Sequence, residues 1–172
     1  MRPRDLKQWV CWRSEERGGR KTKIPCSPRS GSRARCDDPA TWGTFAEARE
    51  AVRERSCDGV GFVFTADDPF CGVDLDGCVD PASGKVEPWA KEIVDHLDSY
   101  TEVSPSGTGL HIIVHAKIPE GRPGNRKDNV EIYDRLRSLF LGLLVRHPLS
   151  LRLCLQSTSS DHRRSHPQLL ST

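Results

Sequence analysis

Gly72-Val73-Asp74-Leu75-Asp76-Gly77 constrains the fold and chemistry of this 172-residue sequence more strongly than any other stretch. Because side chains alternate along a strand, Val73 and Leu75 can enter a core while Asp74 and Asp76 share the opposite face. Two carboxylates on one face can jointly hold Mg²⁺ or Mn²⁺ against the phosphates of a substrate. The motif therefore predicts that Asp74 and Asp76 bind a metal at the end of a buried strand.

Other uses of the same pattern are a solvated acidic pair, a calcium loop and a phosphatase motif. A calcium-binding EF-hand fails, because counting from Asp74 places Val79 at the sixth position and Lys85 at the twelfth, where Gly and Glu are needed. An Asp-x-Asp-Gly sequence after an apolar strand also resembles haloacid-dehalogenase-type phosphatases, in which Asp74 would be the nucleophile and Asp76 the acid/base. This phosphatase interpretation is the main enzymatic alternative.

A second motif, Ser104-Pro105-Ser106-Gly107-Thr108-Gly109-Leu110-His111, is a loop of small residues that leads into an apolar strand. Glycines allow successive amide groups to point into one concavity, which forms a nest for phosphate. The strand would hold His111 beside this nest. His115 would share the face of His111, but we expect it to be structural.

The third motif is Asn129-Val130-Glu131-Ile132-Tyr133, in which alternation buries Val130 and Ile132 and presents Glu131 on the other face. A third carboxylate on a neighbouring strand would complete a cation site. Asp134 is the alternative ligand if the register differs by one residue. Taken alone, Glu131 is a surface charge.

The rest of the sequence predicts an α+β fold with one mixed sheet and helices on one side of it. A capping box at Thr44 and Glu47 begins a helix that ends near Arg55, and apolar spacing predicts a second helix over residues 86–100. A basic hairpin is expected at the N-terminus, with a loop from Arg17 to Lys23. Further strands are expected at residues 59–65 and 71–76, as adjacent strands, and at residues 101–103, 110–116 and 129–133.

Charge is unevenly distributed, although the formal net charge is only +2. Residues 1–56 carry 14 Lys and Arg against 8 Asp and Glu, residues 57–120 carry 3 against 12, and residues 121–172 carry 9 against 4. An acidic centre between basic flanks is typical of a metal site beside a polyanion path. Ordinary solvated faces are the alternative explanation.

Seven cysteines, an odd number without a CxxC pair, disfavour a disulfide framework and a standard zinc knuckle. We expect most of them to be reduced and packed as small apolar residues. The sequence contains no apolar run that would cross a bilayer and no secretory signal, so we expect a cytoplasmic protein without membrane contact.

In order, the Asp-x-Asp strand, the Ser-Gly-x-Gly-x-His element and the apolar strand with an acid resemble the archaeo-eukaryotic primase superfamily. More narrowly, the chain resembles the bifunctional primase-polymerase domains of phage and plasmid replication proteins. Such domains often begin with a Trp-containing strand, a Lys-Xaa-Pro step and a Thr-Trp-Xaa-Thr-Phe-Xaa-Xaa-Ala segment. The matching segments are Gln8 to Trp12, Lys23-Ile24-Pro25 and residues 41–48.

The resemblance implies a mixed β-sheet core of RRM-like type with flanking helices and an N-terminal αβ unit. Asp74, Asp76 and Glu131 would bind a pair of Mg²⁺ or Mn²⁺ ions, and a 3′-hydroxyl would attack the α-phosphate of a nucleotide. The triphosphate would contact Lys23, His111 and the loop residues Ser106, Gly107, Thr108 and Gly109. Arg122, Arg126 and Lys127 are further candidates for contacts with the triphosphate or the template strand.

The implied partners are a DNA template, nucleoside triphosphates and a helicase domain or protein. No Gly-x4-Gly-Lys-Ser/Thr element occurs in this chain. A nucleic-acid-binding remnant without catalysis is a further alternative.

The sequence departs from the family pattern after Asp134. Family members usually continue with Arg, two aromatic residues and a Thr-Xaa-Thr-Gly step, whereas this chain reads Leu136-Arg137-Ser138-Leu139-Phe140-Leu141-Gly142. We therefore divide the chain into a catalytic domain over residues 1–135 and an atypical tail over residues 136–172. The composition of the tail suggests translation in a shifted frame, a hypothesis that the nucleotide sequence of the gene tests. A divergent or disordered native tail is the alternative.

Overall fold

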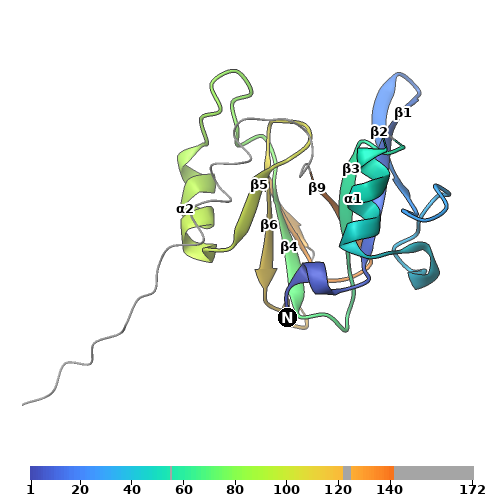
Figure 1. The fold of residues 1–172 in the computed structure, drawn as a ribbon. Helices are drawn as coiled ribbons and strands as arrows, with labels where there is room; N and C mark the ends of the chain where they lie inside the picture. Colours follow the sequence, from blue (N-terminus) through green and yellow to red (C-terminus); the bar gives the residue numbers. More distant parts are fainter. Residues whose placement is uncertain (55, 122–124, 142–172) are drawn as a thin grey trace, which may run out of the picture.

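The computed structural model describes residues 1–54, 56–121 and 125–141 (Figure 1). Two short 3-10 helices, Pro3–Asp5 and Pro39–Thr41, accompany two α-helices and nine strands in this part of the chain. The helices are α1 (Phe45–Arg53) and α2 (Pro88–Leu97). The strands are β1 (Trp9–Arg17), β2 (Arg20–Cys26), β3 (Gly59–Phe64), β4 (Phe70–Leu75), β5 (Tyr100–Val103), β6 (Leu110–His115), β7 (Arg126–Lys127), β8 (Val130–Tyr133) and β9 (Arg137–Leu141).

The strands form two separate sheets, so the predicted α+β class is confirmed but the single mixed sheet is wrong. A four-stranded sheet has the order β2-β1-β3-β9, and a five-stranded sheet has the order β5-β6-β4-β8-β7. Every strand pair among the described residues is antiparallel. The strands β3 and β4 were predicted as neighbours, but the turn between them carries the chain from one sheet to the other.

The predicted basic hairpin is present, but its loop is much shorter than expected. Strand β1 continues to Arg17 and β2 resumes at Arg20, so only Gly18 and Gly19 form the turn. Both glycines have positive φ, as a two-residue turn matched to the strand twist requires. Lys23 consequently lies in a strand and not in a loop.

Alternation along β4 separates an apolar face from a polar face of the five-stranded sheet. Val73 and Leu75 are buried in a cluster that includes Ile112 of β6, and Trp89 and Ile93 of α2 pack against it. Helix α2 therefore covers this face, as Figure 1 shows on the outer side of the sheet. Asp74 lies on the opposite face, as its position in the strand predicted.

The polar face of the five-stranded sheet is turned toward the four-stranded sheet. Away from the charged residues, the two sheets share an apolar core that includes Phe64 of β3, Ile113 of β6, Tyr133 of β8 and Leu139 of β9. Helix α1 packs on the four-stranded sheet through Ala48, which is fully buried. Its predicted capping box is confirmed, because Thr44 and Glu47 exchange hydrogen bonds.

Strand β9 extends the ordered fold past residue 135, where we placed the domain boundary. It pairs with β3 from Val60↔Leu141 to Phe64↔Arg137, and Leu139 and Leu141 are almost completely buried. The fold therefore continues to at least Leu141. The remainder of the predicted tail, residues 142–172, lies outside the described residues, and the frameshift hypothesis stays a prediction.

The described cysteines are free thiols, and all of them except Cys36 are buried. This confirms the expectation of reduced, packed cysteines for that part of the chain. No helix in the described ranges has the length and apolar character that would let it cross a membrane.

Candidate active site

One transverse row of side chains crosses all five strands of the second sheet. The cross-strand partners run from Glu102 of β5 to His111 of β6, Asp74 of β4, Glu131 of β8 and Arg126 of β7. Residues directly opposite each other in antiparallel strands have their side chains on the same face and within contact range. The register thus brings together four residues predicted from the sequence, Asp74, His111, Glu131 and Arg126, each from a different strand.

Asp74 and His111 form the buried part of this row. Nε2 of His111 lies 3.5 Å from Oδ1 of Asp74. Burial, with the nearby carboxylates of Asp76 and Glu131, raises the pKa of Asp74 to about 6. Burial also lowers the pKa of His111 to about 3, with a smaller contribution from the ammonium of Lys23, so its imidazole is neutral at pH 7.

Glu102 lies behind His111, on the side away from Asp74. Its side chain is only 3% exposed, and its Oε1 is 3.9 Å from Nδ1 of His111. This Nδ1 is buried and has no hydrogen-bond partner among the described residues. The hydroxyl of Tyr100 donates to the other carboxyl oxygen of Glu102 over 2.7 Å.

Asp76 and Glu131 form the more open part of the site, and a guanidinium bridges them. Arg126 donates to Oδ2 of Asp76 and, over 3.4 Å, to Oε2 of Glu131. Arg137 of β9 donates to Oε1 of Glu131 over 2.8 Å, which links the second sheet to the first. Asp76 follows the last residue of β4 and has a half-exposed side chain.

Lys23 approaches the site from the four-stranded sheet. Its ammonium lies 5.5 Å from the centre of the Trp12 ring. Burial lowers the pKa of Lys23, and the carboxylates of Asp74 and Glu102 oppose this effect. The sequence placed Lys23 in a loop, yet it lies in β2, where its charge interacts with the carboxylates of Asp74 and Glu102.

The carboxylates suit a hard divalent cation, although their arrangement in this structure is not that of a metal cage. No group of three or more His, Cys, Asp or Glu side chains in the described ranges is placed to hold a metal ion. The guanidinium of Arg126 bridges Asp76 and Glu131, so a positive charge lies between these two carboxylates. The negative charges of Asp76 and Glu131 also contribute to the raised pKa of Asp74, because they disfavour a further negative charge beside them.

The loop before β6 differs from the predicted phosphate nest. The amide of Gly107 donates to the carbonyl oxygen of Ser104 over 2.8 Å, so this donor is used inside the turn. The exposed polar groups are the hydroxyls of Ser106 and Thr108, which lie 3.0 Å apart. Gly109 is buried against β4, where a Cβ atom would meet the carbonyl oxygen of Leu75 at 2.5 Å. The loop therefore lies next to the end of β4, while its role in phosphate binding stays a prediction.

Other candidate residues lie apart from the row. The register places Glu131 opposite Asp74, whereas Asp134 pairs with Arg135 and accepts from the amide of Ile118. His115 lies at the far end of β6, with its ring 5.5 Å from that of Phe70. Lys127 follows Arg126 in β7 and lines a cavity together with Trp89 of α2. Arg122 lies outside the described residues.

Sequence reasoning missed two charged residues of the site, Glu102 and Arg137. The usable signal for Glu102 is an acid inside the strand expected at residues 101–103, since Asp and Glu are uncommon in strand interiors, and the structure shows that this acid is buried. Arg137 had no comparable signal, since its contact with Glu131 depends on the pairing of β9 with β3.

Comparison with known proteins supports a primase-polymerase relationship. No family model matches the chain. Over 113 residues, or 66% of its length, the chain is 42% identical to a DNA primase-polymerase of Nitratiruptor phage NrS-1. The matched stretch spans only 15% of that relative's length. The similarity supports the primase-polymerase resemblance and does not favour the phosphatase alternative.

Proposed function

We propose that this chain is a nucleotidyl-transfer domain of primase-polymerase type, which adds nucleotides to the 3′-hydroxyl of a DNA strand. The observation that carries the proposal is the alignment of Asp74, His111 and Glu131 on three adjacent strands, beside the hydroxyl-bearing loop before β6. The similarity to the phage primase-polymerase supports the same reaction class.

Asp74, Asp76 and Glu131 would hold the divalent cations, which would replace the contacts of Arg126 with Asp76 and Glu131. Bound Mg²⁺ or Mn²⁺ would offset phosphate charge and activate the attacking hydroxyl. Carboxylate oxygens are the ligands that these hard ions prefer. The acidic row repels phosphate on its own, so the carboxylates alone cannot bind a triphosphate.

The remaining residues of the site supply positive charge and hydrogen-bond donors for a triphosphate. Lys23 provides a compact positive charge whose pKa is lowered but whose two acidic neighbours favour protonation. A neutral His111 can donate one hydrogen bond to a phosphate oxygen without adding charge. The exposed hydroxyls of Ser106 and Thr108 add further donors at the end of β4.

A primer-extension assay with Mg²⁺ or Mn²⁺ tests the proposal. Asp74→Asn and Asp76→Asn should each lower nucleotide incorporation at least about 100-fold, since each removes a proposed metal ligand. Binding of single-stranded DNA in a gel-shift assay should change little. Glu92→Gln, on the exposed side of α2, is the matched control and should extend primers like the wild type.

Full incorporation by either aspartate variant would refute the assignment of the ligands. Hydrolysis of phosphate esters by a chain that incorporates no nucleotide would refute the nucleotidyl-transfer function. That result would favour the phosphatase alternative, in which Asp74 is the nucleophile and Asp76 the acid/base.

A further inference from the structure

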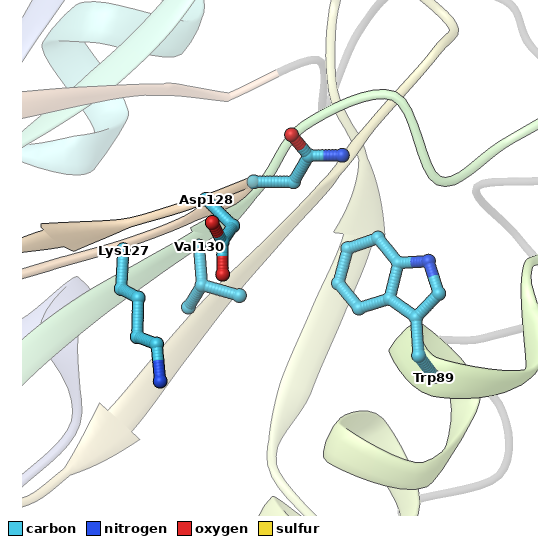
Figure 2. Close-up of a pocket in the computed structure, with 5 residues that line it drawn as sticks. Trp89, Lys127, Asp128 and Val130 are labelled. Carbon is cyan, nitrogen blue, oxygen red and sulfur yellow. The ribbon is translucent and has the colours of Figure 1, made fainter.

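A cavity of about 570 Å³ lies on the face of the second sheet opposite the carboxylate row. Figure 2 shows Trp89 of α2 facing Lys127, Asp128 and Val130 of the β7–β8 hairpin across this cavity. Asn129 completes its lining. The hairpin also reaches the candidate active site, because the amide of Asp76 donates to the carbonyl oxygen of Asn129 over 2.8 Å.

Trp89 differs from the other three tryptophans of the chain. Trp9, Trp12 and Trp42 are buried, and their indole N–H groups donate to backbone carbonyl oxygens. Trp89 is only partly buried, and its indole N–H has no acceptor among the described residues. An indole ring that borders a cavity offers an apolar face on which a flat ring can stack, and its N–H is a donor that no described residue uses.

The hairpin contributes polar groups of three kinds around that indole. Lys127 is a cation, Asn129 has an amide that donates and accepts, and Asp128 has a carboxylate that accepts only. Asp128 has a positive φ of 52°, a backbone conformation that allows the tight turn between β7 and β8. A phosphate alone would meet repulsion from Asp128, so a ligand with both donors and acceptors on its edge fits better.

We infer that this cavity binds one unstacked nucleobase of a single-stranded nucleic acid, an inference that rests on the proposed function. The base would stack on Trp89, and its polar edge would meet Asp128 and Asn129. Lys127 would contact the phosphate of the same nucleotide. Arg126 and Lys127 are consecutive residues of the edge strand β7, so their side chains lie on opposite faces of the sheet. A nucleic-acid strand that crosses the edge at β7 would therefore pass from the carboxylates near Arg126 to the cavity beside Lys127.

Binding of a fluorescently labelled single-stranded oligonucleotide, measured in EDTA by anisotropy, tests this inference without catalysis. Trp89→Leu should weaken binding about tenfold, because an apolar side chain without a ring cannot stack, whereas Trp89→Phe should retain most of the affinity. Lys127→Gln should lower the slope of log affinity against log salt by about 1. Lys85→Gln is the control, since this exposed lysine precedes α2 but does not line the cavity.

Circular dichroism establishes that each variant is folded, and Lys127→Gln changes only an exposed side chain. Wild-type affinity in both Trp89→Leu and Lys127→Gln would overturn the inference, even if the wild-type chain extends primers. Weakened binding in these two variants with an unchanged Lys85→Gln would support it, even if the chain incorporates no nucleotide and the proposed function fails.

Discussion

Arg126 is the residue that competes most directly with the proposed metal for the carboxylates. Its guanidinium bridges Asp76 and Glu131, two of the three proposed ligands. A cation that enters the site must replace these contacts, and both partners of the Arg126–Asp76 pair are half-exposed. Because exposed ion pairs are weak, Arg126 should lower the affinity of the site for a metal ion only modestly.

We therefore predict that Arg126→Gln tightens Mn²⁺ binding about threefold, because the variant removes a competing cation from the carboxylates. Titration calorimetry of the full chain measures this affinity without nucleotide. Arg13→Gln removes an exposed arginine that pairs with Glu15 on the first sheet and should leave Mn²⁺ binding unchanged. Weaker Mn²⁺ binding in Arg126→Gln would show that the arginine supports the site instead.

Residues of the site were predictable where the signal is local. Asp74, His111 and Glu131 follow from strand alternation in three short motifs, because a polar side chain at an alternating position must face away from the core. Glu102 and Arg137 were missed, since Glu102 lies in the short strand β5 outside the three motifs and Arg137 lies in a segment with no motif. Lys23 was found by resemblance, but placed in a loop because its neighbours are basic.

At the scale of elements, the loop before β6 depends on one close approach. A Cβ on Gly109 would lie 2.5 Å from the carbonyl oxygen of Leu75, which is backbone and cannot rotate away. Gly109→Ala should therefore push the loop from the end of β4 and destabilise the protein by about 1–3 kcal/mol. Urea denaturation measures this loss.

Gly18→Ala provides the comparison for Gly109→Ala. Gly18 has a positive φ of 57° in the β1–β2 turn, and no atom lies within 4 Å of the Cβ position. Its substitution strains the backbone without a collision, so we expect a loss of about 1 kcal/mol. A variant Gly109→Ala that is as stable as the wild type would contradict the close approach described above.

Helix α1 begins with a charged cap that gives a testable pH dependence. Hydrogen bonds from Arg29 and from Thr44 lower the pKa of Glu47 from 4.5 to about 2. The folded state thus binds the proton less tightly than the unfolded state, and the carboxylate stabilises the fold above pH 4.5. This contribution is lost as the pH falls from 4.5 toward 2.

Comparison of the wild type with Glu47→Gln isolates this contribution. The wild type should have the higher urea midpoint at pH 7, and the difference should narrow as the pH falls below 4.5. Glu54→Gln, at the C-terminal end of the same helix and outside the capping box, is the control. A constant difference between wild type and Glu47→Gln down to pH 3 would rule out the charged cap.

Elements were easier to predict from the sequence than their partners. The capping box fixed the start of α1, and apolar spacing located α2, because both signals lie within one segment. The division into two sheets was missed. Strand alternation states which side chains are buried, but it does not state which of two sheets a strand joins, and β3 and β4 are only a short turn apart.

At the scale of the whole molecule, the two sheets depend on a strand that the family resemblance did not predict. Strand β9 completes the four-stranded sheet, and its Arg137 binds Glu131 of the other sheet. Leu139 and Leu141 contribute to the core that the sheets share. The sequence from Leu136 onward departs from the family pattern, yet residues 137–141 are compatible with a buried strand because Leu139 and Leu141 alternate with less buried residues.

Two shortened chains test how far the cooperative fold extends. Every strand pairing described lies within residues 9–141, so a chain that ends at Leu141 should melt cooperatively with both sheets intact. A chain that ends at Leu136 loses the burial of Leu139 and Leu141, worth about 1.5–3 kcal/mol each, and exposes the edge of β3. The free energy of unfolding of a typical domain is about 5–15 kcal/mol, which is comparable with this loss. The shorter chain should therefore be largely unfolded or aggregated. Circular dichroism melts and amide NMR spectra distinguish the two chains.

In the full chain, Leu139→Ala should lower the free energy of unfolding by about 2–5 kcal/mol. Identical melting of the two shortened chains would mean that β9 contributes little to the fold, and Leu139→Ala would then be nearly neutral.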